Sequence, residues 1–413
     1  VMQPKGMLET IEKHAVGEDA AMIVEALRFI RDPDLYKRMD ATLARILDQR
    51  PGKSYRQWFR VLWDADATGH PKYAEYKSKM YLRIDERFQE YFYYGSQTPA
   101  PKIRLDEIAW GGVKRDGIPP LEDPKTLAVS QATYLDDNDV VFGVSINGDA
   151  RCYPKRILAW HEMVRDTVGG IPINGVYCTL CGSMIVYDTR LDGRQYHLGT
   201  SGFLYRSNKL MYDRQTKSLW NTLRGAPVVG PLVDQGIQLK RLHVVTTNWG
   251  EWKRQHPETR VLSLQTGHRR DYGEGVAYRR YFGTDQLMFD VSVRDNRLKN
   301  KTSILAMRRG DQNAVAITAD FLLANRIHHD SVGPDKVVVL TDDGGGNRVY
   351  KVGDLEISAG THPQSFVDQN GGVWKQTEAG LISGSDKEKT LPRYPAHRAF
   401  WFGWYATYPN TRL

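Results

Sequence analysis

The sequence predicts an α+β fold. An N-terminal all-α helical bundle is followed by a duplicated, mostly antiparallel β-rich unit whose two copies are related by a pseudo-two-fold axis. Three observations lead to this prediction. Apolar residues recur at spacings of three and four within residues 1–95, which is the period of amphipathic helices. Strand-like alternation starts near residue 139 around an Asn-Gly turn, a strong hairpin signal. Short segments of this β-rich stretch then recur, in the same order, further along the chain.

Residues 1–95 are predicted to form a bundle that resembles helical repeats. Ile11 to Ile30 has helical apolar spacing and stops at Asp32-Pro33, because proline cannot continue a helix interior. Leu35 to Leu47 repeats the pattern. The surface of these helices carries no chemical motif, so we expect the bundle to pack against the rest of the chain or to bind a protein partner.

The domain boundaries follow from composition. Turn formers are dense at 95–101, and the following segment combines turns with large apolar residues such as Trp110, which is typical of a segment that lies against a core. The predicted parts are a helical bundle at 1–95, a linker and docking segment at 96–134, a first β-rich repeat at 135–265, a connector at 266–294 and a second β-rich repeat at 295–413.

The duplication is predicted from paired motifs. Four residues separate Trp249-Gly-Glu-Trp252 from Pro-Glu-Thr-Arg260, and four residues likewise separate Trp401-Phe-Gly-Trp404 from Pro-Asn-Thr-Arg412. One motif is not shared. Cys178-Thr-Leu-Cys181 of the first repeat is replaced in the second by the thiol-free turn Asp342–Asn347. Shared positions are expected to maintain the fold, so any chemical site belongs to the first repeat.

The Cys178/Cys181 pair permits several kinds of chemistry. Two sulfur atoms at this spacing can form a redox disulfide, supply two ligands to a soft metal, or give a thiolate of lowered pKa. A four-thiolate zinc site is excluded, because only Cys152 remains. The flanking segments are strand-like, which favours a loop or hairpin over a thioredoxin-type helix start. The alternatives are an inert short-loop disulfide and buried, unreactive thiols.

Two histidines are candidate partners of the cysteines. His161 and Glu162 follow Trp160 on a predicted helix and would face the cysteine loop as ligand, base or supporting carboxylate. His197 follows one strand after the cysteine hairpin, which would place it across the sheet from Cys181. The predicted metal ligands are therefore Cys178, Cys181, His161 and His197. Copper is the first metal to test among the transition metals, because thiolate and imidazole suit it. Each histidine could instead be a hydrogen-bonded boundary residue.

A polar run follows the cysteines. Arg206 and Asp213, with Arg214, would suit an ion-pair network that lines a cleft, and they are candidate catalytic residues together with Cys178, Cys181 and His197. The alternative is that these charges hold the edge of a sheet together.

Composition excludes several classes of protein. A net charge of +8 over 413 residues, with basic and acidic residues interleaved, predicts a solvated surface, or at most attraction to acidic polysaccharide or anionic lipid. No zinc-finger spacing or reading helix is present, so nucleic acid is not an expected partner. No run of eighteen apolar residues occurs, so no transmembrane segment is expected. No nucleotide cofactor is expected.

From Ile103 onward the chain resembles the bacterial and archaeal family called domain of unknown function 3179. The resemblance is carried by segments such as INGDARCYPKRILAWHEMVRDTVGG, VYCTLCGSMIVYD and SGFLYRSNKLMYDRQTKSLW. Cys178, Cys181, His161 and Ser201-Gly202 lie in these blocks, although members usually carry Pro where this chain has Thr179. The resemblance implies an exported protein of the periplasm, cell envelope or exterior, in an oxidising compartment. It implies no specific activity.

Two functions are expected from these observations. The first is an exported protein with a metal or thiol-redox site in the first repeat, an oxidoreductase if it is an enzyme. The second is a non-catalytic binding or scaffold protein of the envelope. In this second function the cysteines form a structural disulfide, and a cleft lined by some of the 10 Trp and 22 Tyr residues holds a small molecule or an envelope protein.

Overall fold

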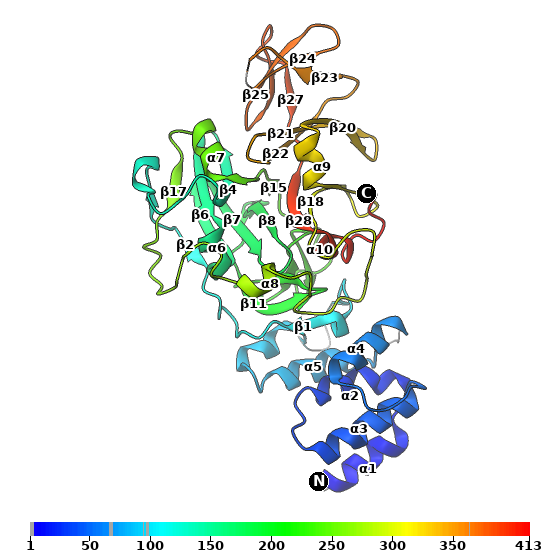
Figure 1. Cartoon of the computed structure of the whole chain (residues 1–413). Helices are drawn as coiled ribbons and strands as arrows, with labels where there is room; N and C mark the ends of the chain where they lie inside the picture. Colours follow the sequence, from blue (N-terminus) through cyan, green and yellow to red (C-terminus); the bar gives the residue numbers. More distant parts are fainter. Residues whose placement is uncertain (1–3, 66–68, 94, 96–98, 363) are drawn as a thin grey trace.

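A computed structural model describes residues 4–65, 69–93, 95, 99–362 and 364–413. Its N-terminal part is helical and the rest consists mainly of β-sheets (Figure 1), so the predicted α+β class with N-terminal helices is confirmed. Part of the predicted linker, residues 96–98, lies outside the described residues. Within the described ranges, no helix combines the length and apolarity needed to cross a bilayer.

The bundle contains more and shorter helices than predicted. The single helix expected from Ile11 to Ile30 is wrong, because the chain turns at Gly17. Val16 is extended (φ −124°, ψ 176°) and its N–H donates to the Asp19 carboxylate at 3.0 Å. The helical elements are α1 (Pro4–His14), the 3₁₀ helix Gly17–Asp19, α2 (Ala20–Leu27), α3 (Pro33–Ile46), α4 (Tyr55–Asp64), α5 (Tyr73–Tyr81) and the 3₁₀ helix Glu86–Tyr91.

A buried ion pair joins the bundle to the first sheet. Lys77 Nζ donates to Glu25 Oε2 at 2.9 Å and to the carbonyl oxygen of Ile108 at 2.9 Å, and both charged side chains are fully buried. Tyr81 also donates to Glu25. Ile108 opens β1 (Ile108–Trp110), which pairs with β11 (Leu198–Tyr205). Because a buried charge is tolerated only when it is paired and hydrogen-bonded, this contact fixes how the bundle meets the sheet.

The first β-rich unit begins with the predicted hairpin. β4 (Val140–Ile146) and β5 (Asp149–Pro154) pair across Asn147-Gly148, which have φ values of 51° and 82°, as the favoured two-residue turn requires. The strand orders are β16-β4-β5-β17-β3, β15-β8-β7-β6-β2 and β1-β11-β12-β13-β14, with a separate β9-β10 hairpin. The remaining bounds are β2 Leu121–Glu122, β3 Thr126–Leu127, α6 Lys155–His161, β6 Met163–Val168, β7 Ile171–Cys178, β8 Ser183–Asp188, β9 Arg190–Leu191, β10 Arg194–Gln195, β12 Asn208–Asp213, β13 Leu219–Asn221, β14 Ala226–Val229, β15 Arg241–Leu242, β16 Val245–Asn248, α7 Trp249–Gln255 and β17 Arg260–Leu262.

The second β-rich unit follows a connector that contains the short helix α8 (Arg279–Phe282). Its strand orders are β19-β18-β28, β20-β21-β22 and β23-β24-β25-β26-β27. The bounds are β18 Ser303–Arg309, β19 Asn313–Thr318, α9 Ala319–Ala324, β20 Ile327–Val332, β21 Asp335–Thr341, β22 Asn347–Lys351, β23 Ile357–Ala359, β24 Ser365–Asp368, β25 Val373–Gln376, β26 Gly380–Ser383, β27 Thr390–Pro392, β28 Ala396–Phe400 and α10 Trp401–Tyr405.

The two units make reciprocal contacts. The cysteine turn between β7 and β8 touches the start of α10, because the N–H of Phe400 donates to the carbonyl of Cys181 at 2.6 Å. The turn between β21 and β22 of the second unit touches the end of β16, just before α7, where Thr247 donates to Asp342 at 3.3 Å. Each unit therefore places one turn against the strand end and following helix of the other.

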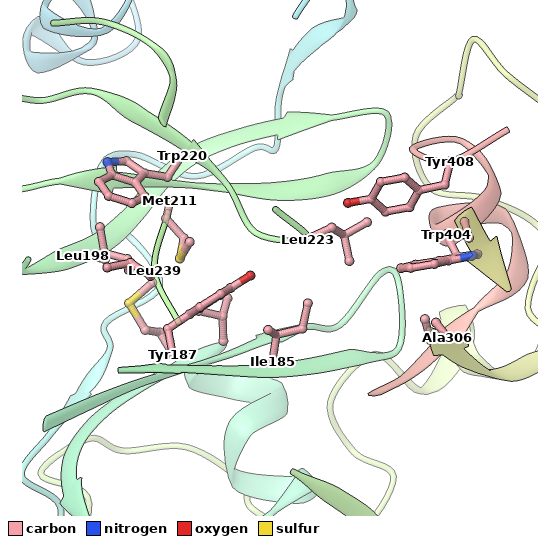
Figure 2. Close-up of a cluster of buried hydrophobic side chains, with 14 of the residues drawn as sticks. Ile185, Tyr187, Leu198, Met211, Trp220, Leu223, Leu239, Ala306, Trp404 and Tyr408 are labelled. Atoms are coloured by element: carbon pink, nitrogen blue, oxygen red, sulfur yellow. The ribbon is translucent and has the colours of Figure 1, made fainter. Parts of the chain in front are cut away.

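One hydrophobic core spans both units (Figure 2). Tyr187 and Trp220 of the first unit and Trp404 of the second belong to the same cluster of buried side chains, and all three are almost fully inaccessible to solvent. The two units therefore depend on each other for the burial of their apolar faces.

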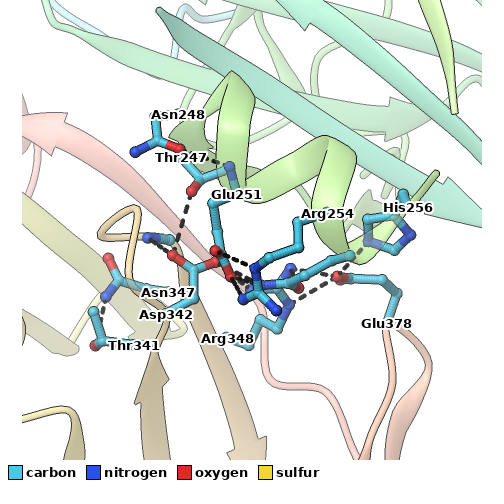
Figure 3. Close-up of polar contacts among 12 residues, drawn as sticks. Thr247, Asn248, Glu251, Arg254, His256, Thr341, Asp342, Asn347, Arg348 and Glu378 are labelled. Carbon is cyan, nitrogen blue, oxygen red and sulfur yellow. Dashed lines mark hydrogen bonds and ion pairs between the residues drawn. The ribbon is translucent and has the colours of Figure 1, made fainter. Parts of the chain in front are cut away.

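A buried network of charges also joins the units (Figure 3). Arg348, whose side chain is 1% exposed, donates to Asp342 at 2.8 Å, to Glu378 at 2.7 Å and to the Gln255 side chain at 2.7 Å. Glu378 also accepts from Arg393 at 2.7 Å. Gln255 closes α7 of the first unit, whereas the four charged residues belong to the second.

A substitution at Gly182 tests the contact between the units. This glycine has φ +60°, and a Cβ there would lie 2.9 Å from the Phe400 ring. We expect Gly182→Ala to lower the free energy of unfolding by roughly 2–4 kcal/mol, because an unfavourable backbone conformation and overpacking add. Gly193→Ala is the matched control, since Gly193 has φ +75° with nothing within 4 Å. Equal losses in urea unfolding of the two variants would contradict a tight contact at Gly182.

Candidate functional site

The cysteine pair lies in the tight turn of the β7–β8 hairpin, as predicted. The N–H of Cys181 donates to the carbonyl of Cys178 at 3.1 Å, the bond that closes a four-residue turn. Both sulfur atoms face the carbonyl oxygen of Ser207, at 3.9 Å for Cys178 and 3.2 Å for Cys181. Cys178, Cys181 and Cys152 are free thiols. The turn places the two cysteine Cα atoms within the range that a disulfide bridges.

A second turn holds the Ser207 carbonyl in place. Arg206 and Ser207 join β11 to β12 with φ values of 48° and 61°, the conformation of a two-residue hairpin turn that usually requires Asn or Gly. The Arg206 side chain donates to Glu107 at 2.5 Å and to the carbonyl of Ala406 at 2.7 Å. These contacts stabilise a strained turn directly over the thiols.

The two thiols differ in acidity. Burial on its own acts to raise the pKa of both thiols. For Cys178, hydrogen bonds from the Cys181 thiol and from the backbone N–H groups of Lys209 and Cys181 outweigh burial, so its pKa is lowered. For Cys181, burial and the neighbouring Cys178 both act in the same direction and raise the pKa well above its ordinary value. Cys178 is therefore the more nucleophilic member of the pair, because the thiolate is the reactive form.

A buried acidic group lies next to the cysteine turn. Glu162 ends α6 in the left-handed region (φ 55°), and its carboxylate accepts from Thr179 at 2.8 Å, from Lys209 at 2.7 Å and from Tyr278 at 3.0 Å. Thr179 lies between the two cysteines in sequence, so this ion pair also fixes the cysteine turn. These three donors, one of them the Lys209 side chain, satisfy both carboxylate oxygens.

A small cavity adjoins this ion pair. It measures about 50 Å³, which is enough for one or two water-sized groups. Its polar lining includes Glu162, Lys209 and Thr200, and its apolar lining includes Leu180 and Phe289. The Lys209 and Glu162 side chains therefore both line this cavity, next to the cysteine turn.

The connector covers the turn. Tyr281 donates to the carbonyl of Leu180 at 2.7 Å, and Tyr278 reaches Glu162 as described above. Tyr281 and Val291 share a hydrophobic cluster with Cys178 and Cys181. As a result the cysteines are only 2% and 1% exposed, and any reactant must displace part of the connector to reach them.

The structure does not bring either candidate histidine to the thiols. His161 is bonded through its two ring nitrogens to the Pro119 carbonyl at 2.9 Å and to Tyr272 at 2.6 Å, and burial lowers its pKa. His197 is exposed just before β11. Its expected place across the sheet from Cys181 is wrong, because β8 pairs with β7 and β15 whereas β11 belongs to another sheet.

The residues of the predicted polar network do not lie together. Arg206 precedes β12 and Asp213 is its last residue, so the two lie at opposite ends of this strand. Asp213 accepts from the backbone N–H and the hydroxyl of Thr216, both at 2.7 Å, and so holds the turn after β12. Arg214 contacts Asp116 at 3.1 Å. Of these residues, Arg206 is the one that supports the cysteine site.

Sequence reasoning missed Lys209 and Tyr278. Lys209 lies on β12, a strand whose six residues are all buried, and a lysine in a fully buried strand needs a buried partner. The strand sequence NKLMYD mixes polar and apolar residues, so the burial of Lys209 follows from the structure and not from a local pattern. Tyr278 comes from the connector, and its contact with Glu162 spans 116 residues, so no local pattern indicates it.

The donor set at the thiols is small. Among the described residues, no group of three or more His, Cys, Asp and Glu side chains is placed to hold a metal ion. The two sulfur atoms and the Ser207 carbonyl are the candidate ligands at the turn. This set lacks the imidazole of a mixed Cys/His site, although two thiolates are ligands that monovalent copper accepts.

The fold and the site together define an α+β protein with a buried thiol pair beneath a connector that joins two β-rich units. A family model described as "Protein of unknown function (DUF3179)" matches residues 115–411. The chain belongs to this family, as its motifs indicated. No curated protein and no solved structure matches the chain.

Proposed function

We propose that the chain is an exported thiol-redox protein in which Cys178 and Cys181 alternate between dithiol and disulfide. The observation that supports this most strongly is the convergence of both sulfur atoms on one carbonyl within a single turn, at 3.9 and 3.2 Å. Both cysteines lie in one hairpin turn, whose Cα separation falls in the range that a disulfide bridges. The unequal acidity of the two thiols supplies one nucleophile and one resolving cysteine.

The chemistry is thiol–disulfide exchange with a small disulfide. The Cys178 thiolate attacks one sulfur of the incoming disulfide, and the other sulfur leaves as a thiolate that takes up a proton. Cys181 then loses its proton and attacks the Cys178 sulfur of the mixed disulfide, which releases the second thiol. The substrate gains two electrons from the cysteine pair and two protons, one from Cys181 and one from the solvent that took up the Cys178 proton when this thiol ionised. Lys209 and Glu162 act as positioning residues, because they hold Thr179 and the turn.

The order of elements in the two units supports the predicted duplication, with the thiol site in the first copy. The order hairpin, helix, three consecutive antiparallel strands, further sheet, strand and Trp-containing helix occurs in both units. In both, the segment after that helix pairs in parallel with the second hairpin strand, as Val261 with Cys152 and as Arg412 with Val315. We propose that 135–265 and 295–413 are two copies of one unit about a pseudo-two-fold axis. In the second copy, charged residues occupy the place of the thiols.

Differential alkylation tests the proposed thiol cycle. The protein is equilibrated with oxidised or reduced glutathione, alkylated after denaturation, and analysed by peptide mass spectrometry. Cys178 and Cys181 should lose and regain alkylation together. Cys152 is the internal control, because it is fully buried in another core cluster and burial raises its pKa. Constant alkylation of all three cysteines would contradict the proposal.

Copper is the cofactor we propose to test beside the redox cycle. Two converging thiolates would suit monovalent copper, and the metal would then be lost in a Cys178→Ser/Cys181→Ser double variant. Elemental analysis of untagged protein, with the double variant as control, measures this. One copper per chain in the wild type alone would support a copper site in place of the disulfide cycle.

A specific observation favours a second function. The deep burial of both thiols is typical of structural cysteines, and a separate cavity between the bundle and the connector has aromatic walls. The chain would then be a non-catalytic envelope protein that binds a small molecule or another envelope protein. A disulfide that forms but resists reduction under native conditions would favour this alternative.

A further inference from the structure

An aromatic cavity lies where the bundle, β1 and the connector meet. It encloses about 60 Å³, which is less than half of the ~150 Å³ that encloses benzene. Its edge includes the exposed Arg56, so a ligand can extend outward there. The cavity is lined by Arg28, Tyr55, Arg56, Phe59, Trp63, Tyr81, Asp106, Ile108, Ala109, Trp110, Phe289 and Asp290.

Arg28 presents an unneutralised guanidinium group to this cavity. Its hydrogen bonds are long, at 3.5 Å to the Tyr81 hydroxyl and 3.4 Å to the Trp110 carbonyl. The guanidinium carbon lies 5.1 Å from the centre of the Trp110 ring and 5.8 Å from that of Tyr55. Among the described ion pairs none includes Arg28. Because the group carries five N–H donors, most of its capacity to bind an anion is unused.

The surrounding charges do not neutralise Arg28. Asp106 is paired with Arg104 at 2.8 Å, and Asp290 with Arg60 at 2.6 Å. Arg56 contacts the Tyr55 hydroxyl at 3.3 Å and forms no ion pair within the part of the chain that the structure describes. The cavity therefore carries an excess of positive charge beside aromatic rings.

We infer that this cavity binds a small organic carboxylate. The carboxylate would accept a forked pair of hydrogen bonds from Arg28, the geometry that guanidinium groups favour. The apolar part of the ligand would lie against Phe59 and Trp63, whose rings are stacked at 6.0 Å. Aromatic walls favour a carboxylate with an apolar body over a fully hydrated inorganic anion. This inference does not rest on the proposed thiol chemistry.

Calorimetric titration at constant ionic strength tests the inference. The probes are benzoate, its neutral relative benzyl alcohol, and inorganic phosphate. Benzoate should bind at one site per chain, and Arg28→Gln should weaken it at least tenfold, because a charge-assisted hydrogen bond is lost. Arg28→Lys keeps the charge without the fork and should give a smaller loss. Arg31→Gln is the matched control, since Arg31 is exposed on the same segment, and should leave the affinity unchanged.

Four other outcomes of this titration would overturn the inference. Binding of benzyl alcohol as tight as that of benzoate would show that the negative charge is irrelevant. Binding of phosphate as tight as that of benzoate would show that the apolar body is irrelevant. Absence of benzoate binding to wild-type protein, or equal weakening by Arg28→Gln and Arg31→Gln, would exclude this carboxylate site. Melting temperatures recorded without ligand establish that each variant is folded.

Discussion

Replacing Arg348 by methionine is expected to lower the free energy of unfolding by about 3–5 kcal/mol. The substitution removes the central cation of the network in Figure 3 and leaves Asp342 and Glu378 buried without that partner. A lone buried charge keeps its desolvation cost after its partner is lost. Guanidinium unfolding curves of wild type and variant measure the effect.

Arg326→Met is the matched control. Arg326 also forms an ion pair with an aspartate, Asp343, but their side chains are 52% and 68% exposed. Exposed pairs of this kind contribute roughly 0–1 kcal/mol. Losses of similar size in the two variants would contradict a role of the buried network in joining the units.

The same network predicts a dependence on pH. Burial alone would raise the pKa of Glu378, but Arg348, Arg393 and the contact with His256 hold it well below its usual value. A carboxylate with a lowered pKa contributes stability above its unfolded pKa, about 4.3, and loses that contribution as pH falls. Burial raises the pKa of Asp342, which acts in the opposite direction. The difference between wild type and Glu378→Gln should therefore shrink below about pH 4.

The second large effect is expected at the cysteine site. Lys209→Met should also destabilise the protein by about 3–5 kcal/mol, because Glu162 is then left buried without its cation. In the double variant Lys209→Met/Glu162→Gln the neutral amide can still accept from Thr179 and Tyr278, so most of the loss should be recovered.

A double-mutant cycle measures this coupling. The four proteins of the cycle are compared by urea unfolding, and the alkylation rate of Cys178 is recorded for each. A double variant as unstable as Lys209→Met alone would show that Lys209 acts by packing and not by neutralising Glu162.

Local signals in the sequence predict many of the turns and hairpins of the fold. The hairpin at Asn147-Gly148 and the turn at Cys178–Cys181 depend on neighbouring residues, so their positions could be read directly from the chain. The helix expected at 11–30 was too long, because a helical apolar spacing does not reveal the backbone turn at Gly17.

Long-range pairing explains the other errors. The predicted position of His197 assumes that successive strands share a sheet, but the β9–β10 hairpin intervenes and β11 joins β1 and β12. Tyr278 reaches the site from a connector with little regular structure. Candidate residues within one hairpin could thus be predicted, whereas partners brought by the connector or by another sheet could not.

The reduction potential of the Cys178–Cys181 pair is the most direct measurement of whether this is a working redox site. In buffers of defined glutathione ratio, followed by alkylation and mass spectrometry, we expect a single reversible two-electron transition between about −270 and −120 mV, the range of exchange-active pairs. A potential below about −300 mV would identify a structural disulfide. Two thiols that never pair would contradict the account altogether.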